Sequence, residues 1–158
     1  MPDWPVRRPV LALCAVMAVC GTLASRPAAL AADAGQIKVV HGAAWVERGG
    51  SRLPARIGLR VQESDIVATG ADGSMGIAFA DDSLLSIGPN TVLAIERFAF
   101  DPTTYRGQFE STLRRGTLWA VSGKLTRQSG DAMKVRTPTV VIGVRGTEFL
   151  VRAAPAVE

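Results

Sequence analysis

The chain has 158 residues, which is enough for one domain and leaves little room for two. Its 18 basic and 14 acidic residues give a formal net charge of +4, and so mild an excess does not favour a nucleic-acid partner, because nucleic-acid binders carry clustered basic faces. Both cysteines, Cys14 and Cys20, lie in an N-terminal segment that we expect to be removed. The rest of the chain is therefore predicted to lack disulfides, thiol nucleophiles and zinc–thiolate sites.

Residues 1–31 are predicted to be a secretory signal peptide. A positively charged start is followed by an apolar run over 10–24 and by the small-residue site Ala29-Leu30-Ala31. An uncleaved membrane anchor is the alternative, but the apolar run is shorter than the about 20 residues that a spanning helix needs. We expect cleavage after Ala31, a periplasmic or secreted protein without a stable membrane span, a domain over 32–152 and a flexible tail over 153–158.

The chain after the leader shows short apolar stretches separated by Gly, Asp, Asn and Pro, which is typical of many short strands. In the middle, 72–77, 82–87 and 90–95 each run from a turn residue to an isoleucine, as in a β-meander or a short solenoid. Alternation there places Met75, Ile77 and Phe79 on one face of a strand. Further strands are expected at 37–40, 44–47, 52–55, 59–61, 66–68, 139–144 and 147–151. Two more, 105–113 and 117–121, are expected to pair around a turn at 114–116. The sequence predicts one all-β domain, solenoid-like or sandwich-like, after an N-terminal signal-peptide helix.

Candidate catalytic groups are few. His41 is the one histidine, and a Ser-His-Asp arrangement around it is formally possible, but no Gly-x-Ser-x-Gly elbow accompanies it. A surface or turn histidine is the favoured interpretation. Glu96, Glu110 and Glu148 could form an acid pair for glycoside hydrolysis, although such pairs arise by chance in β proteins. We predict a protein that is not an enzyme, with a small hydrolase as the least favoured alternative.

Two acidic turns are candidate calcium loops, Asp72-Gly73-Ser74 and Asp81-Asp82-Ser83. Each offers fewer carboxylates than a calcium loop requires, and turn formation explains both. No metal and no cofactor are therefore expected. Trp45, Trp119 and Tyr105 could line a sugar-binding surface, but large apolar side chains in strands are more often buried, so we expect them in the core.

The most distinctive segment covers 135–149 and reads VRTPTVVIGVRGTEF. Pro138 sets its own backbone and extends Thr137, which opens a strand. Val140, Ile142 and Val144 are expected to be buried together on one face of it. Glycines flank Arg145, which suggests a bulge or a close backbone approach. Burying that arginine requires a carboxylate, for which the candidates are Glu148, Asp82 and Asp72.

This segment resembles the signature of the FecR domain, an Arg-Thr-Pro stretch followed by Gly-Val-Arg-Gly-Thr-x-Phe. Earlier blocks at 68–74, 79–83, 87–91 and 115–118 also resemble that family, so the resemblance covers nearly all of the expected domain. It implies an all-β, solenoid-like fold. The residues that carry the signature, as structural or partner-contacting positions, are Arg136, Thr137, Pro138, Gly143, Arg145, Gly146, Thr147 and Phe149.

The resemblance also implies a role in signalling. The best-known family members span the inner membrane, sense a loaded outer-membrane receptor and control a sigma factor. Here only residues 1–9 precede the apolar segment, so we do not expect contact with a sigma factor after cleavage. We predict a binding or signalling adaptor whose partner is another cell-envelope protein. A structural or glycan-binding envelope module is the alternative.

Overall fold

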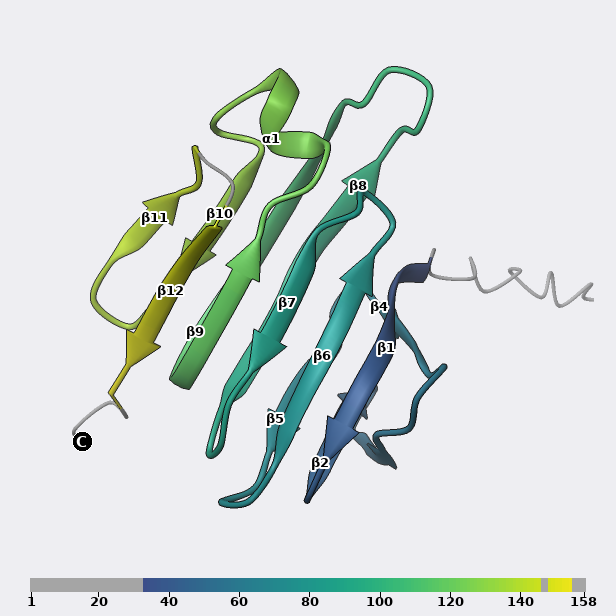
Figure 1. Cartoon of the computed structure of the whole chain (residues 1–158), viewed down its shortest axis with the longest axis vertical. Coiled ribbons are helices and arrows are strands. Elements are labelled where there is room, and N and C mark those ends of the chain that lie inside the picture. The colour runs from purple at the N-terminus through teal and green to yellow at the C-terminus, as the bar shows by residue number, and fades with distance from the viewer. Residues whose placement is uncertain (1–32, 146–147, 155–158) are drawn as a thin grey trace, which may run out of the picture.

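The computed structural model describes residues 33–145 and 148–154, which form twelve β-strands and one short helix (Figure 1). The strands are β1 (Asp33–His41), β2 (Ala44–Arg48), β3 (Ser51–Pro54), β4 (Arg60–Gln62), β5 (Ile66–Thr69), β6 (Ser74–Phe79), β7 (Leu84–Ile87), β8 (Val92–Phe100), β9 (Gly107–Val121), β10 (Met133–Arg136), β11 (Val141–Gly143) and β12 (Glu148–Ala153), and the helix α1 spans Leu125–Gln128. The predicted all-β single domain is confirmed. The expected signal peptide and the residues 155–158 of the expected tail lie outside the described residues.

The strands form two layers that share β9. The first layer has the order β4-β1-β6-β7-β9-β12, and the second has the order β3-β2-β5-β8-β9-β10-β11. Neighbours are antiparallel except β9 and β10, which are parallel. Figure 1 shows the first layer in front of the second, and together they make a curled half-barrel.

The two layers can share β9 because that strand bends at Gly116. Its N-terminal half pairs with β8 and β10, and its C-terminal half pairs with β7 and β12. Gly116 has a φ of +98°, a region that favours glycine, and a Cβ atom there would lie 2.2 Å from the Thr91 Oγ1 atom. The two expected strands around 114–116 are therefore one bent strand, and the prediction of a turn between them was wrong.

The core lies between the layers and follows from period-two alternation. On β6, Met75, Ile77 and Phe79 are buried, while the residues between them are only half-buried. Phe79 packs against Phe98 and Phe109, with ring centroids 4.6 to 5.4 Å apart. The inward-facing set expected for this strand is confirmed.

The three similar units in the middle do not stack as solenoid rungs. β6 and β7 form an antiparallel hairpin in the first layer, whereas β8 crosses to the second layer and pairs with β5 and β9. The sandwich-like alternative is therefore closer to the observed architecture. Throughout the described ranges, no helix is long and apolar enough to cross a membrane.

The apolar strand expected over 139–144 is shorter than predicted. β11 covers Val141–Gly143 at the edge of the second layer, where it pairs with β10 alone. Val140 and Val141 are 55% and 63% exposed, and of the three residues expected to be buried together only Val144 is fully buried. An edge strand preceded by a turn leaves apolar side chains without a covering layer, which is why the prediction failed.

Candidate functional site

The signature begins with an ion-pair cluster at the end of β10. The guanidinium of Arg136 lies 3.6 Å from a carboxylate oxygen of Glu110 and 4.0 Å from one of Glu96. The Thr112 hydroxyl donates a 2.6 Å hydrogen bond to the other oxygen of Glu96. Glu96 and Glu110, considered above as a catalytic acid pair, therefore flank an arginine whose single positive charge they share. Arg136 joins β8, β9 and β10 on the outer side of the second layer.

Thr137 and Pro138 form the turn between β10 and β11. The Thr137 amide donates to the Val140 carbonyl at 2.8 Å, and the Val140 amide donates to the Thr137 hydroxyl at 3.0 Å. Pro138 is exposed at the second position of this turn, where its fixed φ is compatible with the geometry. These two signature residues therefore have a structural role in reversing the chain.

The glycine and arginine positions of the signature differ from expectation. A Cβ atom on Gly143 would meet only an Asp131 oxygen at 3.8 Å, so no close backbone approach requires glycine there. Arg145 is exposed, and its side chain lies over Gly130, whose Cβ would fall 2.3 Å from the Arg145 Nε atom. Gly146 and Thr147 lie outside the described residues.

A buried, ion-paired Arg145 is therefore ruled out by its exposure. Its three candidate partners are engaged elsewhere: Asp82 pairs with Lys124 at 2.7 Å, Glu148 accepts from Trp119, and Asp72 accepts from a backbone amide. We expect Arg145→Ala to leave the free energy of unfolding within about 0.5 kcal/mol of wild type, as for most surface substitutions. Urea unfolding measures this, and a loss of about 3 kcal/mol would contradict the exposed placement.

The charge that is deeply buried is instead the carboxylate of Asp65, which pairs with the partly exposed Arg48. Asp65 is 1% exposed and receives bonds from the Arg48 Nε and Nη2 atoms at 2.8 and 2.7 Å. These hydrogen bonds raise the pKa of Arg48 above its usual value. No local sequence pattern predicts this pair, because β3 and β4 separate Arg48 from Asp65 along the chain.

The last signature residue, Phe149, is half-buried on β12 and packs against the core. Its neighbours Glu148 and Leu150 point to the opposite, outer face, where the Trp119 indole N–H donates a 2.8 Å hydrogen bond to Glu148. β12 continues through Ala153, which is buried, so the ordered strand extends one residue past the expected domain end at 152.

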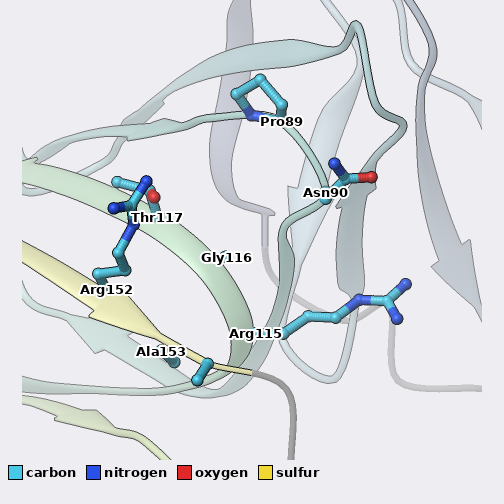
Figure 2. A pocket seen from close by; sticks show the side chains of 8 residues that line it. Pro89, Asn90, Arg115, Gly116, Thr117, Arg152 and Ala153 are labelled. Atoms are coloured by element: carbon cyan, nitrogen blue, oxygen red, sulfur yellow. The ribbon is translucent and has the colours of Figure 1, made fainter.

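A cleft of about 750 Å³ lies beside the bend of β9. Figure 2 shows the side chains of Arg115 and Arg152 on opposite sides of Gly116. The remaining lining residues are Pro89, Asn90, Thr117, Ala153 and Ala154. No acidic residue is among the described residues that line the cleft, and neither arginine makes an ion pair or side-chain hydrogen bond with any other residue that the structure describes.

Sequence reasoning did not identify this cleft. Its residues come from the segments 89–90, 115–117 and 152–154, which the Thr91 hydroxyl helps to join by accepting from the Thr117 amide at 3.0 Å. Arg115 lies where the sequence predicts a turn that does not form, and Arg152 lies next to the boundary of the expected tail. The one usable signal was alternation in β12, which puts Leu150 and Arg152 on the same outer face.

The aromatic residues expected in the core lie at the surface. Trp45 and Trp119 are half-buried on the outer faces of different layers, and Tyr105 is exposed in the loop between β8 and β9. The Arg52 guanidinium covers the Trp45 ring at 4.5 Å from its centroid. The core prediction was wrong for these residues, because each ring finds a polar partner at the surface. Their separation also means that they do not form one sugar-binding platform.

The other candidate groups have structural surroundings. Asp81 is fully buried in the β6–β7 turn, where it accepts the amide and the hydroxyl of Ser83 at 3.1 and 2.6 Å. That is the turn-forming role favoured over calcium binding. His41 is exposed at the end of β1, opposite Ser74. Among the described residues, no group of three or more His, Cys, Asp or Glu side chains could hold a metal ion.

The family model described as FecR protein matches residues 65–157, more than half of the chain. The protein therefore belongs to the FecR family, as the signature indicated. This family acts in signalling and regulation and is not known for enzymatic activity. No curated protein and no solved structure gave a significant match.

Proposed function

We propose that the protein is an exported, non-enzymatic FecR-family adaptor that binds another cell-envelope protein. The observation that carries this proposal is the family match over 65–157 together with the role of that family in signalling. The signal-peptide pattern of residues 1–31 supports export to the periplasm or beyond. Among the signature residues, Arg136, Thr137 and Pro138 contribute by holding the β10–β11 hairpin in place, and Phe149 packs β12 against the core.

In-cell cross-linking tests this function. A carboxy-terminally tagged protein is expressed from the full chain, cross-linked and analysed by mass spectrometry together with everything attached to it. We expect a processed chain beginning at Ala32 and an attached outer-membrane receptor or transmembrane regulator. Attachment to peptidoglycan fragments alone would favour the structural or glycan-binding alternative. An unprocessed chain in the cytoplasm would overturn export.

A further inference from the structure

The four sheet edges differ in how open they are to another strand. β4 and β11 have three residues each, and β3 has four, including Pro54. β12 has six residues, contains no proline, and pairs with β9 alone among the described strands. Short strands and prolines are the usual protection of sheet edges against added strands. β12 is therefore the least protected edge of this part of the chain.

The outer face of β12 presents an acidic, an apolar and a basic side chain in that order along the strand. Glu148, Leu150 and Arg152 point outward, and Leu150 is 66% exposed. The register places Leu150 opposite Trp119, and Arg152 opposite Thr117, on the outer face of β9. A strand added to β12 would continue this pattern, because cross-strand neighbours on one face pair with each other.

The cleft lies where β12 ends, since Arg152, Ala153 and Ala154 form part of its lining. The two arginines of the cleft lack acidic partners among the described residues, so a ligand that complements the cleft carries negative charge. The separation of Arg115 and Arg152 on either side of Gly116 suits an extended ligand better than one compact anion (Figure 2). The part of the lining that the structure describes has no aromatic ring on which a sugar could stack, which favours a peptide over a glycan.

We propose that β12 binds an extended segment of a partner protein by strand addition, with an apolar side chain beside Leu150 and an acidic side chain two positions away beside Arg152. The residues of that segment that extend beyond Arg152 would enter the cleft toward Arg115. This inference rests on the proposed adaptor function and specifies the edge and the chemistry of the partner. Backbone hydrogen bonds would supply affinity, and the outward side chains would supply specificity.

The direct test uses synthetic peptides and the isotopically labelled full-chain protein. The probe is Thr-Glu-Thr-Val-Thr-Lys-Thr, blocked at both ends, which in antiparallel pairing sets Glu beside Arg152, Val beside Leu150 and Lys beside Glu148. The reversed sequence tests parallel pairing. We expect the amide resonances of β12 and the C-terminal half of β9 to shift during the titration. Shifts confined to β3 or β11, or no shifts at all, would overturn the proposal.

A charge exchange makes the test specific. Arg152→Glu should weaken binding of the Glu peptide by roughly fivefold, and a peptide with Lys in place of that Glu should regain the affinity. Arg56→Glu is the matched control, because Arg56 is an exposed arginine in the β3–β4 loop and the substitution changes the net charge equally. Equal affinities for wild type and Arg152→Glu would contradict the assignment of the acidic position.

Two further results separate this inference from the proposed function. If Arg152→Glu combined with Leu150→Thr still captures the same envelope protein in cells, the adaptor function stands and the β12 assignment fails. If the peptides bind but no envelope protein is ever captured, the inference about β12 stands and the adaptor function fails. If the protein forms a dimer that depends on Leu150, a second copy of the chain occupies β12. That result would overturn the proposal of a partner segment with an acidic side chain.

Discussion

Replacing Arg48 with alanine should lower the free energy of unfolding by about 3 kcal/mol, the lower end of the range for breaking a buried ion pair. The substitution removes two of the hydrogen bonds to Asp65 and leaves that carboxylate buried with the Gln62 amide at 2.8 Å. The loss stays at the lower end because the Arg48 side chain is 32% exposed, so water can reach the vacated space. Urea unfolding with a constant m-value measures the change.

The matched control is Arg52→Ala. Arg52 pairs with Glu47 at 3.2 Å between largely solvated side chains and lies over Trp45, so its removal should cost less than about 1 kcal/mol. In a double-mutant cycle, Arg48→Ala and Asp65→Ala together should cost clearly less than the two single losses added, because they share one interaction. Strict additivity would show that the pair is not coupled.

Replacing Gly116 with alanine should lower the free energy of unfolding at least as much as Arg48→Ala does, by about 3 kcal/mol or more. The added Cβ would lie 2.2 Å from the Oγ1 atom and 2.5 Å from the Cα atom of Thr91, which is fully buried and cannot move aside. Backbone strain at the φ of +98° and overpacking each contribute about 1–3 kcal/mol. The measurement is again the urea midpoint, supported by the far-ultraviolet circular dichroism of the folded state.

Gly49→Ala separates the two contributions at Gly116. Gly49 also has a positive φ, +54°, but a Cβ atom there would meet nothing within 4 Å. Only the left-handed backbone then opposes alanine, which costs about 1–2 kcal/mol. If Gly116→Ala and Gly49→Ala lose the same amount, the contact with Thr91 does not matter, and the bend of β9 has some other cause.

The parts of the fold that were predictable from sequence are those set by local alternation. Met75, Ile77 and Phe79 were expected on one face of a strand, and all three are buried. The family signature likewise indicated the all-β class. Both inferences use neighbours along the chain, so they do not depend on which strands pair.

The features that sequence reasoning missed depend on contacts between distant residues. Arg-Arg-Gly at 114–116 carries the same local signal for a turn as for a bend. The contact with Thr91, which lies just before β8, decides between them. The glycines that flank Arg145 suggested that this arginine is buried. An arginine is buried only where a carboxylate is present to pair with it, and the buried carboxylate, Asp65, lies beside Arg48 instead. The cleft requires the pairing of β9 with β12, which no alternation pattern specifies.

The shared strand β9 has a consequence for cooperativity. In a sandwich of two separate sheets, one sheet can loosen while the other persists, because only side-chain packing connects them. Here the backbone of β9 belongs to both, and its partners β7, β8, β10 and β12 come from segments before and after it in the chain. An opening that releases the whole of β9 removes a central strand from both layers, so such an opening disorders the half-barrel as one unit.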